Sequence, residues 1–391
     1  MQLGSLHTKS ERSAQARKVL LSGQDRAGDE SGLLGGLLEN QRKMCECNTW
    51  EQANSQLERR KLEIMSYVHV LRGGLLESRH RVHAAVVRPD GSLLASTGNA
   101  DFTTFLRSSA KPFQAQVLIP FLEHFNLDSS HLAIAMASHG GEPVHTQVVA
   151  ELMERTGVDP AWLICGIHAP FDSGTRNELR SKNEKPNVLH NNCSGKHSGM
   201  LAACLALGLP TQGYATLEHP LQQRILEITR AILETVDIGV AVDGCGVPCY
   251  RVPLHRAALG FAHLAAPDRL PSHRVGLEIA ASAMQAHPYL IAGRERIDTA
   301  LMQAVPNAVS KIGAEALIGV GISSSSHGPL GIALKIEDGG ERARDVAITR
   351  ILEGLGVIGA DDLLTFRAAP ILGVAGDAVG AIQPAFDLIW A

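Results

Sequence analysis

Ser108 and Lys111 lie one helical turn apart in the run 107–112, which reads Arg-Ser-Ser-Ala-Lys-Pro. A serine hydroxyl is a poor nucleophile at neutral pH and needs a base that accepts its proton. A lysine amine is such a base only where burial or a nearby cation keeps it neutral. If a helix begins here, its first backbone N–H groups would also stabilise an oxyanion. The pair therefore indicates acyl transfer, whereas in isolation it is typical of an exposed serine beside a solvated lysine.

A second serine strengthens this interpretation. Ser138 follows the apolar run 132–137 and opens a glycine-rich loop, a place where functional residues collect. The structural alternative is a helix cap, in which Ser138 would cap a helix that begins near Pro143. Glu142 and His145 would then be surface residues of the first helical turns.

A second lysine occurs late in the chain. Lys311 precedes Gly313, whose missing side chain would let a substrate approach the backbone. An isolated Lys-x-Gly is typical of an ordinary loop. However, the order Ser-x-x-Lys, serine-containing loop and Lys-x-Gly is that of the penicillin-recognising serine hydrolases.

Two glycine-rich segments, 191–199 and 243–249, carry candidate metal ligands. Cys193 with Cys245 or Cys249, plus Lys196 or His197, would hold Zn²⁺ and leave one position for water. Lysine must lose its proton to bind a metal, so spacing alone favours His197. The alternatives are buried structural cysteines and a thiol nucleophile beside a histidine.

Composition narrows the class of protein. The chain has 391 residues, 45% of them hydrophobic, and a net charge of −4, which argues against nucleic acid or an anionic membrane as partner. A small neutral or zwitterionic ligand fits better. No run reaches the roughly 18 apolar residues of a spanning helix, and the beginning lacks the apolar core of a secretory signal. Without an export signal, the odd number of seven cysteines argues against a disulfide framework, and we expect a cytoplasmic protein.

The first 64 residues differ from the rest of the chain. They hold 10 Lys/Arg and 9 Asp/Glu, nearly twice the charge density of the remainder, and show no strand pattern. We therefore expect residues 1–64 to be a disordered or mis-annotated extension and 65–391 to form the catalytic domain. Translation starting at Met65 and a genuine flexible appendage are both consistent with this boundary.

Hydrophobic patterns place strands at both ends of the domain and helices between them. Strands are expected at 68–72, 81–87, 92–96, 318–321 and 331–336, and helices at 113–119, 145–156, 195–207, 219–236 and 276–286. This order predicts an α+β fold in which helices flank an antiparallel sheet and form a helical subdomain.

Taken together, the motifs resemble the Rhizobium-type L-asparaginase II family from about Tyr67 to the carboxyl end. The segments that carry the resemblance are 72–80, 107–112, 138–142, 192–197, 243–246 and 311–315. The resemblance implies a fold similar to the serine β-lactamases and penicillin-binding proteins, a homodimer, and hydrolysis of L-asparagine to L-aspartate and ammonia.

The resemblance also implies residue roles. Ser108 corresponds to the nucleophile, Lys111 to its base, and Ser138 with Lys311 to a second pair that relays protons. The implied substrate contacts are Arg107, His139, His197 and Asp243, and the implied ligands of an auxiliary zinc ion are Cys193, Lys196 and Cys245. Lysine thus replaces His197 as the expected ligand.

Two departures from the β-lactamase pattern disfavour a penicillin-binding role. Ile312 stands where Thr or Ser is usual in Lys-Thr-Gly, and the loop at Ser138 is not Ser-x-Asn.

Two alternative functions remain from the sequence. One is an amidase of the same fold acting on glutamine or another amide, and the other is a catalytically idle zinc-binding protein.

Overall fold

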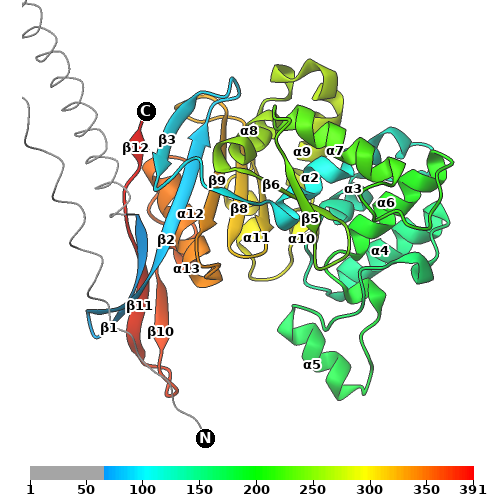
Figure 1. The fold of residues 1–391 in the computed structure, drawn as a ribbon. Helices are drawn as coiled ribbons and strands as arrows, with labels where there is room; N and C mark the ends of the chain where they lie inside the picture. Colours follow the sequence, from blue (N-terminus) through cyan, green and yellow to red (C-terminus); the bar gives the residue numbers. More distant parts are fainter. Residues whose placement is uncertain (1–65) are drawn as a thin grey trace, which may run out of the picture. The chain divides into compact units, whose positions relative to one another are not determined.

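The computed structural model describes residues 66–391, so the expected extension 1–64 and its boundary at Met65 lie outside the described residues. An antiparallel sheet runs through the domain in the order β10-β11-β1-β2-β9-β8-β7, with β3 beside β2 and β12 beside β3 (Figure 1). Its strands are β1 (Tyr67–Arg72), β2 (Leu75–Val87), β3 (Leu93–Thr97), β7 (Ala308–Gly313), β8 (Leu317–Ile322), β9 (Leu330–Ile336), β10 (Ala369–Leu372), β11 (Ala378–Ala385) and β12 (Ile389–Trp390).

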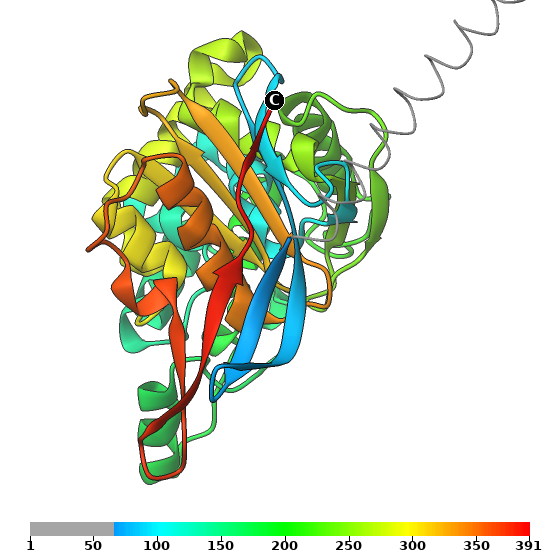
Figure 2. The same ribbon diagram turned by 90° about the vertical axis from the view of Figure 1, so that its left-hand side faces the viewer.

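The long strand β2 joins the two halves of this sheet. Its first part pairs with β1, and its second part pairs with β9 and β3. Because β1 also pairs with β11, the first and last parts of the described chain lie side by side, as Figure 2 shows. Alternate residues of β2 face opposite sides, so Ala84 and Val86 join one hydrophobic core and Ala85 and Val87 the other. Both faces of the sheet are therefore covered at the second half of β2, whereas the first half of this strand is exposed.

Helices cover the two faces. On one face α8 (Leu254–Ala265) packs on β2, β8 and β9, and on the other α12 (Glu341–Gly354) packs on β9 and β11. Glycines let α8 approach closely, because a Cβ at Gly319 would lie 1.9 Å from the Phe261 ring and one at Gly331 would lie 2.0 Å from the Ala258 carbonyl oxygen. Two short helices lie beside these elements: α11 (Ile297–Ala304) packs on β7, and α13 (Leu364–Arg367) packs on α12.

The middle of the chain forms the helical part of the domain and a small antiparallel sheet of order β4-β6-β5 (Figure 1). The strands are β4 (Thr103–Phe105), β5 (Gly239–Val242) and β6 (Pro248–Pro253). The helices are α2 (Lys111–Gln114), α3 (Ser129–Met136), α4 (Pro143–Thr156), α5 (Ser173–Ser181), α6 (Ser194–Ala206), α7 (Pro220–Ile232), α9 (Arg274–Ala286) and α10 (Pro288–Ile291).

Seven 3₁₀ turns complete the described elements. They are η1 (Arg107–Ala110), η2 (Ala115–Val117), η3 (Ile119–Phe121), η4 (Pro160–Trp162), η5 (Val188–His190), η6 (Pro267–Arg269) and η7 (Pro271–His273).

The predicted α+β class is confirmed, since an antiparallel sheet flanked by helices is joined to a helical region. The expected helix at 113–119 is wrong, because α2 ends at Gln114 and 3₁₀ turns follow it. Two features interrupt it. The Gln116 side chain donates to the Pro112 carbonyl oxygen (3.1 Å), and Pro120 has no N–H with which to continue the helix.

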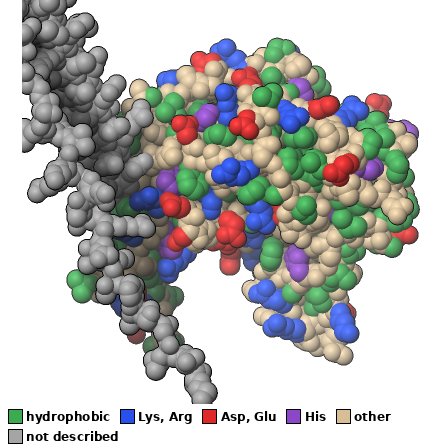
Figure 3. All heavy atoms as spheres, viewed as in Figure 1, with side chains coloured by type: hydrophobic (Ala, Val, Ile, Leu, Met, Phe, Trp, Pro, Cys, Tyr) green, Lys and Arg blue, Asp and Glu red, His purple; other side chains and the backbone are tan. Residues whose placement is uncertain are grey.

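Within residues 66–391, no helix combines the length and the apolar character that crossing a bilayer requires. Acidic and basic side chains are interspersed over the face drawn in Figure 3.

Candidate functional site

The backbone around Ser108 is held from two sides. Leu106 N–H donates to the carbonyl oxygen of Tyr250 on β6 (2.8 Å), and a Cβ at Gly313, the last residue of β7, would lie 2.5 Å from the Leu106 carbonyl oxygen. Arg107 has φ +49°, a left-handed conformation that costs energy for a residue other than glycine and occurs often at functional sites. Ser108 thus lies in the 3₁₀ turn η1, between the small sheet and the edge strand β7 of the large one.

Lys111 lies one turn later and is fully buried. Its amino group donates to Ser138 Oγ (3.0 Å), to the Asn192 carbonyl oxygen (3.1 Å) and to the Ala137 carbonyl oxygen. Burial lowers the pKa of Lys111 from its ordinary value, although the charge of Cys193 opposes the shift. Ser138, rather than Ser108, is therefore the hydroxyl that Lys111 contacts.

Lys311 lies inside strand β7 rather than in a loop, and it is also fully buried. Burial lowers its pKa to about 7, while the Asp298 carboxylate opposes the shift. Asp298 Oδ2 lies 3.7 Å from Lys311 Nζ and accepts from the Ile312 N–H (3.0 Å), and Asp298 Oδ1 accepts from the Ser310 hydroxyl (2.7 Å). A lysine with this pKa exchanges its proton near neutral pH, which suits a general base.

Cys193, Lys196 and Cys245 form one cluster next to Lys111. Lys196 Nζ lies 2.9 Å from Cys245 Sγ. A hydrogen bond from Cys245, followed by the charges of Lys111 and Lys196, holds the pKa of the Cys193 thiol well below its usual value, whereas bonding to Cys193 raises the pKa of Cys245. Burial alone would lower the pKa of Lys196, but the two cysteines outweigh it and raise that pKa.

The donor set of this cluster fits a zinc ion in its chemistry, because two soft sulfur ligands and one amine nitrogen adjoin in a buried place. Among the described residues, no group of three or more His, Cys, Asp or Glu side chains is arranged to hold a metal. The predicted set contains only two residues of these types, since its third ligand is lysine. Cys249 lies on β6 opposite Ala241 of β5, and burial raises the pKa of its thiol to about 11.

Arg107 and Asp243 form an ion pair beside this cluster. Asp243 Oδ1 accepts from Arg107 Nη2 (3.0 Å) and Nε (3.2 Å). Burial would raise the pKa of Asp243, but the Arg107 hydrogen bond and the Lys196 charge outweigh it and lower the pKa. Both side chains are partly exposed, at 29% and 15%, so the pair presents one cationic and one anionic group that a ligand reaches.

One ring nitrogen of His197 is buried without a hydrogen-bond partner among the described residues. The Ile164 N–H donates to the Tyr214 phenol oxygen (3.3 Å), and the phenol donates to His197 Nδ1 (2.5 Å). His197 Nε2 then carries the proton, is buried, and has no hydrogen-bond partner among residues 66–391. Burial, together with the charges of Lys196 and Lys111, holds the pKa of His197 well below its usual value, so the ring is a neutral donor.

His139 differs, because both of its ring nitrogens already have protein partners. Nδ1 accepts from the Gly141 N–H (3.2 Å), so Nε2 carries the proton and donates to the Ser194 hydroxyl (3.1 Å). Burial, followed by the charge of His145, keeps the pKa of His139 well below its usual value. This geometry favours a supporting role for His139, and its contact with substrate stays a prediction.

The alternative in which Ser138 caps a helix is wrong. The cap of α4 is Glu142, and Glu142 and His145 are buried at 4% and 0% exposure rather than on the surface. Reasoning from the sequence also missed Asp298 and Tyr214. The one available signal for Asp298 was a carboxylate flanked by apolar residues in the segment 297–301, where an acidic side chain needs a buried partner.

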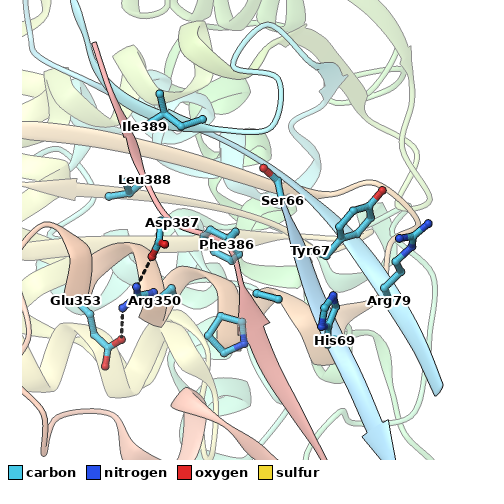
Figure 4. Close-up of a pocket in the computed structure, with 12 residues that line it drawn as sticks. Ser66, Tyr67, His69, Arg79, Arg350, Glu353, Phe386, Asp387, Leu388 and Ile389 are labelled. Atoms are coloured by element: carbon cyan, nitrogen blue, oxygen red, sulfur yellow. Dashed lines mark hydrogen bonds and ion pairs between the residues drawn. The ribbon is translucent and has the colours of Figure 1, made fainter. Parts of the chain in front are cut away.

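A cavity of about 400 Å³ adjoins the cluster, and Tyr214 and Gly246 are among the residues that line it. A different pocket, of about 720 Å³, is drawn in Figure 4. It lies between β1 and the C-terminal segment and is lined by Tyr67, Arg79 and Arg350, among others. The β1 strand is separated in the sheet from β7, which carries Lys311, so this second pocket belongs to another part of the domain.

One comparison with known proteins, the family match, agrees with the resemblance. The family model described as L-asparaginase II matches residues 68–384. No curated protein matches the chain in sequence. Similar solved structures include Mglu in its native form (14% identity, 72% of this chain and 67% of that chain covered, TM-score 0.38). A Bacillus glutaminase also matches (14% identity, 71% and 91% covered, TM-score 0.33).

The family match includes Ser108, Lys111, Ser138 and Lys311, and the Cys193–Lys196–Cys245 cluster. It covers most of the described chain. The chain therefore belongs to the L-asparaginase II family of amide-hydrolysing enzymes.

Proposed function

We propose that this protein hydrolyses L-asparagine to L-aspartate and ammonia through an acyl-enzyme on Ser108. Two observations carry the proposal. Lys111, one helical turn after Ser108, makes a buried contact with Ser138, and the pKa of Lys311 is low. Membership of an amide-hydrolysing family supports the reaction class.

In the first half of the reaction, Ser108 Oγ attacks the carbon of the substrate's side-chain amide. The Lys111 amine in its neutral form accepts the hydroxyl proton, and the Ser138 hydroxyl and the Lys311 amine relay one proton to the leaving nitrogen. The C–N bond breaks and ammonia leaves, so the aspartyl group remains as an ester on Ser108. In the second half, water attacks the ester, the same amines accept its proton, and Ser108 Oγ leaves with a proton.

Side chains at the edge of the cluster suit the charged end of an amino acid. Arg107 would bind the α-carboxylate and Asp243 the α-ammonium group, since both are partly exposed and oppositely charged. The free Nε2–H of His197 is a donor for a carboxylate or carbonyl oxygen. His139 would support this arrangement through Ser194.

We propose Cys193, Lys196 and Cys245 as ligands of an auxiliary Zn²⁺. When bound, zinc would supply an electrophile that holds the charged end of the substrate and polarises nearby water. Because Lys196 must give up its proton to become a ligand, binding at this cluster would release protons.

The test is ammonia release from L-asparagine by purified protein, with Ser108→Ala and Ser181→Ala run alongside. Ser181 is an exposed serine on α5 and is the matched control. We expect Ser108→Ala to lower kcat by more than about 10³-fold and Ser181→Ala to leave it unchanged. Folded Ser108→Ala protein that releases ammonia at the parent rate would refute the assignment of the nucleophile.

A panel with glutamine, a peptide amide and a β-lactam separates asparagine from other substrates. Faster release from glutamine would assign a glutaminase with the same mechanism. Zinc binding without hydrolysis of any amide would favour the idle binding protein. The homodimer implied by the resemblance stays a prediction.

A further inference from the structure

The loop that carries Ser138 is tied to the segment around α10. The Ser138 N–H donates to the Ile291 carbonyl oxygen (2.9 Å). His145 Nδ1 accepts from the Glu142 N–H (3.2 Å), so the ring proton lies on Nε2, which donates to the Tyr289 carbonyl oxygen (3.0 Å). The His145 and Tyr289 rings also stack at 5.8 Å, nearly parallel. Contacts at both ends of the loop thus reach the same neighbouring segment.

The Glu142 carboxylate completes this connection. One oxygen accepts from the Arg294 N–H (3.1 Å), and the other accepts from the Tyr289 hydroxyl and lies 3.6 Å from the Arg294 guanidinium. A Cβ at Gly293 would lie 2.4 Å from Glu142 Oε1, so the segment also fits closely around the carboxylate. Both oxygens of a nearly buried acidic group are therefore used to hold residues 289–294.

The same segment continues into the helix that carries Asp298. Thr299, the next residue, donates its hydroxyl back to the Gly293 carbonyl oxygen (2.8 Å), so the turn between Gly293 and Asp298 is braced internally. Asp298 in turn contacts Lys311 on β7. One continuous stretch of chain therefore connects the loop of Ser138 to the partner of Lys311.

We infer that Glu142 is a positioning residue that keeps Ser138 in register with Lys311 through residues 289–298. The inference rests on the proposed function, in which both side chains transfer protons. Proton transfer needs donor and acceptor within hydrogen-bond reach, and a displacement of about 1 Å costs on the order of 10²-fold in rate. Substrate binding by Arg107 and Asp243 uses other segments of the chain and is affected little.

The experiment compares Glu142→Gln, Tyr289→Phe and their double variant with the parent. Glu154→Gln is the matched control, because Glu154 is exposed on the same helix α4. Steady-state kinetics with L-asparagine gives kcat and KM, and thermal unfolding reports stability. Hydrogen exchange of the amides of residues 138–142 reports whether the loop is held, independently of activity.

We expect Glu142→Gln to lower kcat about 10- to 100-fold with KM within about 3-fold of the parent value, and to speed exchange of the Ser138 amide. Tyr289→Phe should act in the same direction. In the double variant, the fold-loss of kcat should be smaller than the product of the two single losses and close to the larger of them, since the two residues share one hydrogen bond.

Unchanged kcat in folded Glu142→Gln protein would overturn the inference, as would a raised KM with parent kcat or an equal loss in Glu154→Gln. A parent protein that hydrolyses none of the amides would instead refute the proposed function. Hydrogen exchange then decides the inference by itself: faster exchange at Ser138 supports the positioning role, and unchanged exchange rejects it.

Discussion

Replacing Asp298 by asparagine removes a negative charge from Lys311 while keeping nearly the same shape. The Lys311 amine lies 3.7 Å from Asp298 Oδ2, and both side chains are fully buried. At an effective dielectric constant of about 20, the attraction between unit charges at this distance is about 4.5 kcal/mol. Since about 1.4 kcal/mol corresponds to one pKa unit, loss of the carboxylate lowers the pKa of Lys311 by up to about 3 units. The parent value, lowered by burial, is about 7.

The direction in which the pH profile shifts follows from the chemistry of Lys311, because only its neutral amine accepts a proton. In the parent, kcat/KM for L-asparagine should rise with pH through about 7 as Lys311 loses its proton. In Asp298→Asn this rise should move to lower pH. The assay is a pH profile of kcat/KM from about pH 5 to about pH 9, with folding checked by circular dichroism.

Asp268→Asn is the control, because its carboxylate is exposed at 81% and pairs with Arg274 at the surface. We expect its profile to match the parent. An unchanged acid limb in active, folded Asp298→Asn protein would show that Lys311 does not set this ionisation. An equal shift in Asp268→Asn would show that the displacement does not come from the buried pair.

Two further predictions concern the metal and the packing of the sheet. Cys193→Ser should reduce zinc bound per chain, measured by atomic absorption after dialysis, whereas Cys249→Ser should keep the parent amount; the reverse result would transfer the ligand assignment to Cys249. Gly319→Val should lower the free energy of unfolding by about 1–3 kcal/mol or more, measured by urea denaturation, because even its Cβ would lie 1.9 Å from the Phe261 ring. Stability equal to the parent would show that α8 shifts away from β8 at little cost.

Much of the fold was predictable from local patterns. Alternating apolar residues predicted the strands near Tyr67 and Leu330, and helical spacing predicted α4, α6 and α9 within a few residues. The helix expected after Phe113 failed for a local reason, since Gln116 and Pro120 interrupt its backbone bonds. The long reach of β2 was underestimated, because its first half is stabilised by pairing with β1 rather than by its own apolar pattern.

The candidate site was predictable in its residue types and only partly in its contacts. Spacing placed Lys111 beside Ser108, but the structure turns the Lys111 amine toward Ser138. Spacing also favoured His197 over Lys196 for a metal, while the fold places Lys196 against Cys245 and His197 against Tyr214. These contacts join residues that are far apart in the chain, and no local sequence pattern predicts which way their side chains point.

The sequence by itself determined which reactive residues are present: two Ser and Lys pairs, three cysteines on two glycine-rich segments, and the periodicities of an α+β domain. Tertiary structure decided how that inventory is used. Lys311 has a pKa near 7 because burial in β7 removes its hydration while one carboxylate, Asp298, partly compensates. Glu142 was expected on the surface if Ser138 capped a helix, and it became a buried link because a distant segment folds around it. Burial and long-range contact set the electrostatics of a site, and both exist only once segments far apart in the chain have packed together.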